Sequence, residues 1–171
     1  PTEQLEAKYP VLVERYSLRT DSGGAGRHRG GLGAEFVATA LAPFSISAYT
    51  ERRHCAPWGL EGGGDGAGNR VDLRVGGEWQ EGVNAKVLAK RLTAGDAFRI
   101  RSGGGGGFGD ARQRPVEQVL RDVREGYVSR EAAERDYGVV VDVMGELDIA
   151  GTMARRAPAA DSAAAKGAAP K

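Results

Sequence analysis

The chain has 171 residues, of which 27 are glycine, and its 24 Lys and Arg residues nearly balance its 23 Asp and Glu residues. The glycine share is roughly twice the average, but no Gly-x-y period is present, which excludes collagen. A net charge of +1 gives no electrostatic footprint for nucleic acid or for an anionic membrane. The only cysteine, Cys55, excludes an intrachain disulfide and is compatible with a reducing compartment, so we expect a cytoplasmic protein.

The first hundred residues are dominated by strand patterns. Residues 1–9 predict a short helical turn that Pro10 ends. Residues 34–42 and 44–52 predict two strands around Pro43, for which a hairpin is one arrangement. The Gly76-Gly77 pair predicts a tight hairpin turn between two further strands. The other predicted strands are residues 11–19, 70–75, 78–80, 86–92 and 97–101.

The glycines fall into three clusters between these strands, with six glycines each in residues 23–33, 59–68 and 103–109. Glycines at this density permit close backbone approach and positive φ angles. They can present several N–H groups to an anion, let two protein surfaces meet tightly, or form flexible linkers. At this level the alternatives stay open. The loop positions of interest are Gly23, Gly24, Gly26, Gly30, Gly31, Gly33, Gly104, Gly105, Gly106, Gly107 and Gly109.

After residue 110 the pattern becomes helical. Val116, Val119, Leu120 and Val123 recur on one face of a helix that begins near Pro115 and ends near Gly126. A second helix is predicted from an N-cap at Ser129 to Tyr137, a strand at 139–143, and a short helix at 148–156. The predicted fold class is therefore α+β. A mainly antiparallel β body (1–110) with glycine-rich loops precedes a helical appendage (111–156) and a disordered Ala/Pro/Lys tail (157–171).

Familiar site motifs are weak in this sequence. Gly104-x-Gly106-x-x-Gly109 fits a dinucleotide pattern, but the following helix starts several residues too late to face a pyrophosphate. No cluster is followed by Gly-Lys-Ser/Thr, which excludes a P-loop. With two histidines and one cysteine, no spacing matches a zinc site, and no metal site is predicted in this chain. Cys55 is expected to be a buried, small apolar residue.

One basic cluster has two interpretations. Arg52, Arg53 and His54 lie beside Pro57-Trp58, either as a solvated edge strand or as contacts for an anion such as a carboxylate. The carboxylates are scattered, and no pair identifies an acid/base couple. The sequence therefore contains no self-sufficient catalytic set of residues.

Five segments in register resemble the C-terminal portion of the hydantoinase B/oxoprolinase family, up to about Asp148. The resemblance includes the usual lysine-bearing segment, here Asn84-Ala85-Lys86, in which a glycine is more usual at Ala85. The five segments, whose glycine clusters are each weak alone but specific together, are PTEQLEAKY (1–9), DSGGAGRHRGGLG (21–33), ERRHCAPWGLEGG (51–63), AGDAFRIRSGGGGGFGD (94–110) and VSREAAERDYGV (128–139).

The resemblance implies an ATP-dependent enzyme with two components. An A-type ATPase partner would bind ATP and Mg and phosphorylate a carbonyl oxygen of a cyclic amide. The B-type component would direct hydrolysis, with a divalent metal held in its upstream portion and none held by this chain. A ketone carboxylase and a non-catalytic assembly module are the alternatives, and the chain is expected to be a fragment or a split subunit of a hetero-oligomer. Polar contacts to substrate or to a partner are expected at Arg27, His28, Arg29, Arg52, Arg53 and Lys86.

Overall fold

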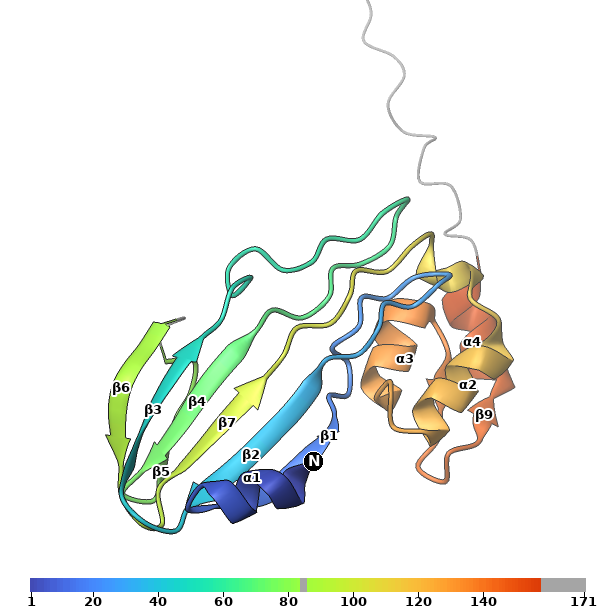
Figure 1. The fold of residues 1–171 in the computed structure, drawn as a ribbon. Coiled ribbons are helices and arrows are strands. Elements are labelled where there is room, and N and C mark those ends of the chain that lie inside the picture. Colours follow the sequence, from blue (N-terminus) through green and yellow to red (C-terminus); the bar gives the residue numbers. More distant parts are fainter. Residues whose placement is uncertain (84–85, 158–171) are drawn as a thin grey trace, which may run out of the picture.

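A computed structural model describes residues 1–83 and 86–157. An antiparallel β half and a helical module lie at opposite ends of the molecule, and long extended loops run between them (Figure 1). The predicted α+β class is confirmed. The main sheet has five strands in the order β1 (Val11–Leu18), β2 (Ala34–Ala40), β7 (Ala97–Arg101), β4 (Arg70–Val75) and β5 (Glu78–Gln80).

Strand alternation gives this sheet two chemically different faces. In β7, Phe98 and Ile100 point to one face while Arg99 and Arg101 point to the other, as a period of two requires. The register continues the pattern across the sheet, because Ala38 pairs with Phe98 and Phe98 with Leu73. One face is therefore apolar and forms the main core, and the opposite face is charged.

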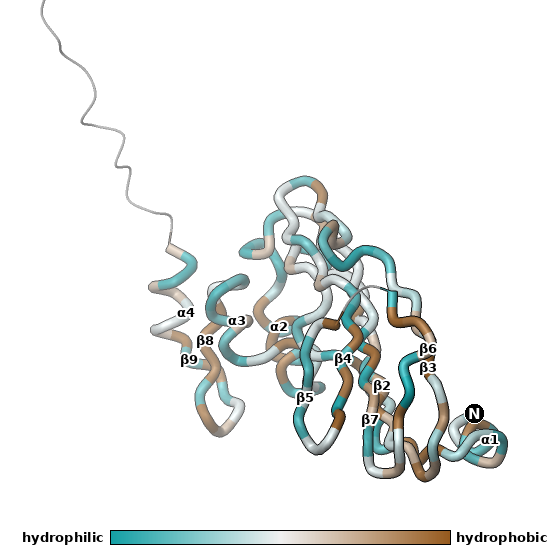
Figure 2. The backbone as a smooth tube through the Cα atoms, turned by 90° about the vertical axis from the view of Figure 1, so that its left-hand side faces the viewer, coloured by the Kyte–Doolittle hydropathy of each residue, from teal (hydrophilic) through white to brown (hydrophobic). Residues whose placement is uncertain are grey.

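A second layer covers part of the apolar face. It consists of α1 (Thr2–Lys8) and the two-stranded ladder of β3 (Phe44–Tyr49) with β6 (Lys86–Leu92). Figure 2 shows both on the same side of the main sheet. Buried Leu92 and Val87 of β6 pack with the sheet core, and Phe44 of β3 contacts Phe98 edge to face at 6.5 Å between ring centroids.

The prediction that β2 and β3 could pair as a hairpin is wrong. β2 is hydrogen-bonded on one side to β1 and on the other to β7, so it has no free edge for β3. The connection after Ala40 instead carries the chain out of the sheet into the second layer, where β3 pairs with β6. The hairpin predicted at Gly76-Gly77 between β4 and β5 is confirmed.

The glycine clusters form a hydrogen-bonded bundle of extended segments, which we call the glycine bundle (residues 19–33, 50–69 and 102–110). Its backbone bonds join all three segments: Gly24 N–H donates to the Gly105 carbonyl at 2.8 Å, and Gly64 N–H donates to the Ala25 carbonyl at 2.7 Å. The backbones lie so close that a Cβ at Gly30 would overlap the Gly105 carbonyl oxygen. Glycine is required here for close packing.

The helical module has its own hydrophobic core. It contains η1 (Ala111–Gln113), α2 (Val116–Arg124), α3 (Arg130–Tyr137), the strand pair β8 (Val140–Val141) and β9 (Leu147–Asp148), and α4 (Ile149–Arg156). Ser129 caps α3 by accepting a bond from the Ala132 N–H, and Gly138 ends it with φ 63°. Both helix boundaries agree with the sequence prediction. Residues 158–171 of the predicted tail lie outside the described residues.

Specific bonds attach the helical module to the first glycine segment. The Ser129 N–H donates to the Asp21 carboxylate at 2.7 Å, and the Asp21 N–H donates to the Tyr127 carbonyl at 3.1 Å.

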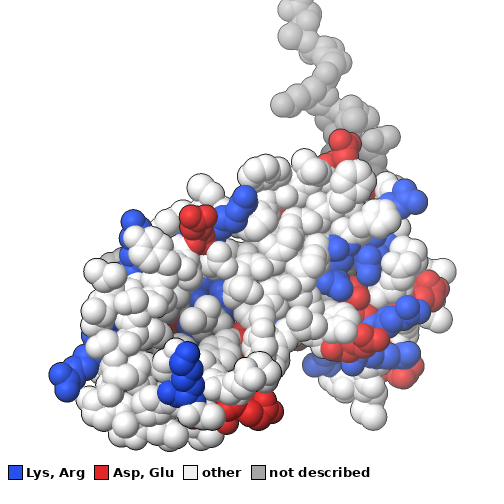
Figure 3. All heavy atoms as spheres, viewed as in Figure 1, with Lys and Arg blue, Asp and Glu red and all other residues white. Residues whose placement is uncertain are grey.

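Burial raises the pKa of Tyr137, in the module's core, to about 12. Figure 3 shows acidic and basic side chains crowded together over this module, whereas the β half carries few charges on the same view.

Candidate functional site

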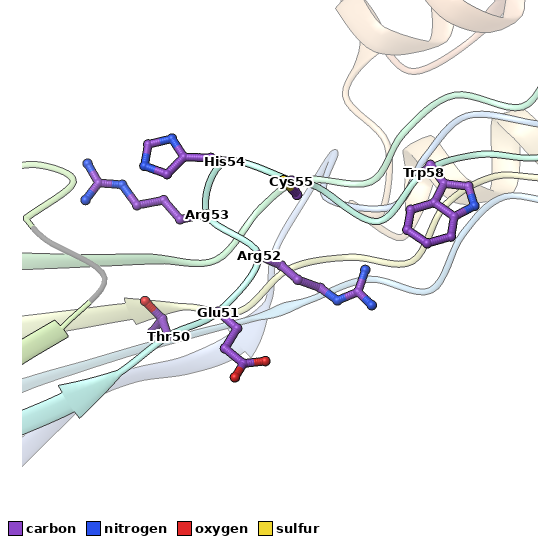
Figure 4. A pocket seen from close by; sticks show the side chains of 7 residues that line it. All are labelled: Thr50, Glu51, Arg52, Arg53, His54, Cys55 and Trp58. Atoms are coloured by element: carbon purple, nitrogen blue, oxygen red, sulfur yellow. The ribbon is translucent and has the colours of Figure 1, made fainter.

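A hollow lies beside the predicted basic cluster, where the second glycine segment leaves β3. It has a volume of about 510 Å³ and is lined by Thr50, Glu51, Arg52, Arg53, His54, Cys55 and Trp58, and we call it the Arg52 pocket (Figure 4). Arg52 adopts φ 51°, a left-handed backbone that costs a non-glycine residue roughly 1–2 kcal/mol. Strain of this kind is concentrated at ligand clamps and active sites. Asp21, Glu61 and Ala89 also have positive φ angles, but Arg52 is the one of the four that lines this pocket, beside an exposed indole, and this combination makes the pocket the candidate site.

Arg52 and Trp58 form the centre of the pocket. The Arg52 guanidinium carbon lies 5.8 Å from the centre of the Trp58 ring, and the indole is 65% exposed. Among the described residues, the Arg52 guanidinium has no hydrogen-bond or ion-pair partner. A cation held over an aromatic face with its N–H donors free suits a planar anion such as a carboxylate.

The neighbouring predicted residues have other roles. Figure 4 shows Arg53 and His54 directed away from Trp58. Arg53 donates to the Val83 carbonyl at 2.8 Å and also to the Gly82 carbonyl, so it anchors the loop before β6. Cys55 is exposed, and its predicted burial is wrong, because β3 ends at Tyr49 and leaves Cys55 in a loop.

The three candidates of the first glycine segment are divided between structural and exposed positions. Arg29 is the structural one: its Nε donates to Asp122 at 3.2 Å, and its side chain is only 16% exposed. His28 pairs with Phe108 across the bundle, with their ring centroids 6.2 Å apart. The Arg27 side chain is exposed, and none of these three residues lines the Arg52 pocket.

Lys86 lies at the start of β6, with its ammonium 4.9 Å from the centre of the Tyr49 ring. Its side chain is exposed. It is not among the residues that line the Arg52 pocket. Asn84 and Ala85, the other members of its motif, lie outside the described residues.

Most of the candidate loop amides are already used inside the bundle. An amide that donates to a protein acceptor cannot also cradle an anion, so the pattern favours close packing over a phosphate nest. The N–H groups that donate to acceptors within the bundle are those of Gly24, Gly30, Gly33, Gly104, Gly105, Gly107 and Gly109. The remaining candidates, Gly23, Gly26, Gly31 and Gly106, lie among them in the same segments.

A buried ion cluster on the charged face of the sheet escaped sequence reasoning. The Asp72 carboxylate is fully buried and lies 2.7 Å from both Arg99 and Arg101. Burial alone would raise the pKa of Asp72, but bonds from the Gly82 N–H and from Arg99 outweigh it and hold the pKa below its usual range. The available signal was alternation, because Arg99 and Arg101 share a strand face.

Neither a metal centre nor a membrane span is found in the described part of the chain. Across residues 1–83 and 86–157, no three His, Cys, Asp or Glu side chains are grouped closely enough to hold a metal ion. The described residues therefore supply no complete set of metal ligands. None of the helices in the same ranges is long and apolar enough to cross a bilayer.

Curated relatives match most of the chain. It is 39% identical over 161 residues to the beta subunit of the caprolactamase of Pseudomonas jessenii, a match that covers 91% of this chain and 27% of that protein. It is 33% identical over 150 residues to the B-type subunit of a putative D-/L-hydantoinase from Pseudomonas sp. (strain NS671), covering 86% of this chain and 25% of that protein. The chain thus spans about a quarter of the length of these relatives.

Two solved structures share the fold. A nucleotide-free acetone carboxylase structure gives a TM-score of 0.80 at 25% identity, covering 92% of this chain and 26% of that chain. The ATP-dependent caprolactamase of Pseudomonas jessenii gives a TM-score of 0.74 at 37% identity, covering 92% and 28%. The family model described as hydantoinase B/oxoprolinase matches residues 1–111. In agreement with the resemblance seen in the sequence, the chain belongs to the hydantoinase B/oxoprolinase family.

Proposed function

We propose that the chain is the C-terminal part, or a split subunit, of an ATP-dependent enzyme that opens a cyclic amide such as a lactam or a hydantoin. The observation that carries the proposal is the 39% identity to a caprolactamase beta subunit along 91% of the chain. The solved caprolactamase of the same organism is described as ATP-dependent. In this proposal an A-type ATPase subunit and the rest of the B-type subunit complete a hetero-oligomer.

The chemistry explains the need for ATP. Resonance makes the carbonyl carbon of a lactam a poor electrophile, and transfer of a phosphoryl group to its oxygen makes that carbon reactive toward water. In the proposal ATP and Mg bind to the A-type partner, and a divalent metal binds to the upstream part of the B-type subunit. In the same proposal, this chain contributes binding and positioning.

The Arg52 pocket supports such a binding role. The Arg52 carbonyl accepts a bond from the Asn69 N–H at 3.3 Å, which ties the Arg52 backbone to the bundle, and the guanidinium lies over the Trp58 ring. Its free donors and the adjacent indole suit a carboxylate or a phosphorylated oxygen on an otherwise apolar ring. The cyclic amide itself presents no charge until it is phosphorylated or opened, so Arg52 would act on those later species.

The test is an activity assay of the assembled enzyme. The chain, the A-type subunit and the rest of the B-type subunit are mixed with ATP and, in turn, caprolactam, hydantoin or 5-oxoproline. We expect ring-opened product and ADP to form together on at least one of these substrates. Failure of the complete assembly to open any cyclic amide in an ATP-coupled manner would refute the proposal.

A ketone carboxylase is the second candidate, and a specific observation favours it. The acetone carboxylase structure matches 92% of the chain with a TM-score of 0.80. The same assembly with acetone, ATP and labelled bicarbonate separates the two candidates. Label in a carboxylate product supports the carboxylase, whereas ATP-coupled ring opening without incorporation of label supports the amidohydrolase.

A further inference from the structure

Part of the apolar face of the main sheet has no second layer over it. The ladder of β3 and β6, together with α1, covers the region around Phe98 and Leu73. Toward the glycine bundle the cover ends, and Tyr16 and Leu18 of β1 are 71% and 55% exposed. Tyr16 pairs with Phe36 in the register and meets its ring edge to face at 5.9 Å, which places it on the apolar face.

Two adjoining hollows mark this uncovered region. One has a volume of about 440 Å³ and is lined by Pro1, Thr2, Leu5, Tyr16, Phe36 and Ile100. The other has a volume of about 230 Å³ and is lined by Tyr16, Ser17, Leu18 and Ala34. They share Tyr16, and no charged side chain lines either of them. We call the apolar residues of the two hollows the Tyr16 face: Leu5, Tyr16, Leu18, Ala34, Phe36 and Ile100.

The opposite face of the same sheet carries charged side chains, as a surface that faces water does. There Arg15 forms an ion pair with Glu35 at 3.2 Å, and Arg74 lies 3.4 Å from Glu14. A sheet with one charged and one apolar face normally buries the apolar face against another layer. The view of Figure 3 looks onto the side that carries α1 and shows few charges over the sheet. The Tyr16 face therefore has the composition of an interior surface.

We propose that the Tyr16 face is the surface on which the rest of a B-type subunit packs, an inference that rests on the proposed function. In the matched relatives, the part that aligns with this chain is about a quarter of a longer polypeptide, so it is covalently joined to the remaining three quarters. Permanent interfaces are more apolar than transient ones and resemble a divided domain core. An uncharged sheet face with two hollows fits such a partner.

A chimera with a cysteine reporter tests this inference. The aligned quarter of the Pseudomonas jessenii caprolactamase beta subunit is replaced by this chain, which carries Cys55→Ser and Tyr16→Cys. Maleimide labelling of the new thiol is then timed in the chimera and in the isolated chain. We expect labelling at least tenfold slower in the chimera. Because Tyr16 is largely exposed, its replacement leaves the core intact.

Leu88→Cys in the same background is the matched control. Leu88 is 78% exposed on β6 and is not among the residues that line either hollow, so its replacement thiol is expected to react at the same rate in both proteins. If the thiol at position 16 reacts equally fast in both while the thiol at position 88 behaves as expected, the inference is wrong, whatever the activity of the assembly. Slow labelling in the isolated chain together with a dimer mass in light scattering would identify a second copy as the occupant and would overturn the inference.

A second experiment does not depend on the folding of the chimera. The isolated chain is co-expressed with the caprolactamase beta subunit that lacks the aligned quarter, and complex formation is measured by size-exclusion chromatography. We expect a 1:1 complex that Tyr16→Glu together with Leu18→Glu weakens at least tenfold and that Leu88→Glu leaves intact. If the Tyr16 and Leu18 substitutions leave the affinity of the complex unchanged, or if no complex forms, the inference is contradicted.

Discussion

The guanidinium of Arg52 lies over the Trp58 indole, 5.8 Å from the ring centre, on a backbone turned to φ 51°. The left-handed turn directs the Arg52 side chain toward Trp58 while the next side chains point away from it (Figure 4). Arg52 thus combines a strained backbone, free donors and an aromatic platform, and this combination is the basis of its proposed role in binding.

Arg52→Ala is expected to lower kcat/KM of the assembled enzyme about 10–100-fold, the effect of losing one charge-assisted contact worth roughly 1.5–3 kcal/mol. Arg52→Gly should lower activity equally while leaving the free energy of unfolding unchanged or up to about 1 kcal/mol higher, because glycine accepts the left-handed backbone. Arg91→Ala, an exposed position on β6, is the control. Unchanged turnover in Arg52→Ala would favour a non-catalytic assembly module.

Two adjacent glycines give a direct test of the bundle. A Cβ at Gly30 would overlap the Gly105 carbonyl oxygen, whereas a Cβ at Gly31 has no heavy atom within 4 Å. Gly30→Ala is therefore expected to lower the free energy of unfolding by about 3 kcal/mol. Gly31→Ala should be neutral or stabilise by about 0.5 kcal/mol through the unfolded chain. Equal unfolding midpoints in urea for the two variants would refute the close packing of the segments.

Arg29 should behave as a structural residue, unlike Arg52. It links the first glycine segment to Asp122 of α2, which also accepts a bond from Arg114 at 2.9 Å. Arg29→Ala is expected to lower the free energy of unfolding by about 2 kcal/mol, and a double-mutant cycle with Asp122→Asn should give a coupling of about 1 kcal/mol or more. Additive effects on the urea midpoint would show that the pair is not coupled.

The Asp72 cluster predicts a particular pH dependence. The pKa of Asp72 is depressed in the folded state, so its stabilising contribution is present above the unfolded value near 4 and is lost as the pH falls through the folded pKa. Asp72→Asn should cost about 3 kcal/mol at pH 7, because it leaves Arg99 and Arg101 without a buried counter-charge. Urea unfolding of both proteins between pH 7 and pH 3 measures this.

The difference in stability between the wild-type protein and Asp72→Asn should be constant from pH 7 to about pH 5. It should shrink at lower pH as the wild-type carboxylate takes up a proton. Leu12→Ala, an exposed position on the same face of the sheet that removes no charge, serves as the control. A difference that grows as the pH falls would have the wrong sign for a depressed pKa and would contradict this explanation.

Local signals predicted the local structure. The glycine pair at 76–77 marked the turn between β4 and β5, and Ser129 and Gly138 marked both ends of α3. The pairing of β3 with β6 could not be predicted in this way, because it depends on β2 having both edges occupied by strands distant in the sequence. The exposure of Cys55 could not be predicted for the same reason. β3 ends at Tyr49, where its pairing with β6 ends, and this leaves Cys55 in a loop.

The candidate site was predictable only in part. The basic cluster next to Trp58 was visible in the sequence, but sequence could not distinguish Arg52, with free donors, from Arg53, which binds two carbonyl groups of the loop before β6. Likewise, the sequence does not distinguish Arg29 from its neighbour Arg27, because the partner of Arg29, Asp122, lies on α2. These distinctions depend on contacts between residues 29 to 93 positions apart.

An omission experiment tests most directly whether the chain is a necessary part of such an enzyme. The A-type subunit and the rest of the B-type subunit are assayed for ATP-coupled opening of caprolactam, first without this chain and then with increasing amounts of it. We expect no turnover without the chain, and we expect turnover to saturate at one chain per molecule of the remaining B-type subunit. Full turnover in its absence, or none at any ratio on any cyclic amide, would contradict the claim that the chain is a necessary part of such an enzyme.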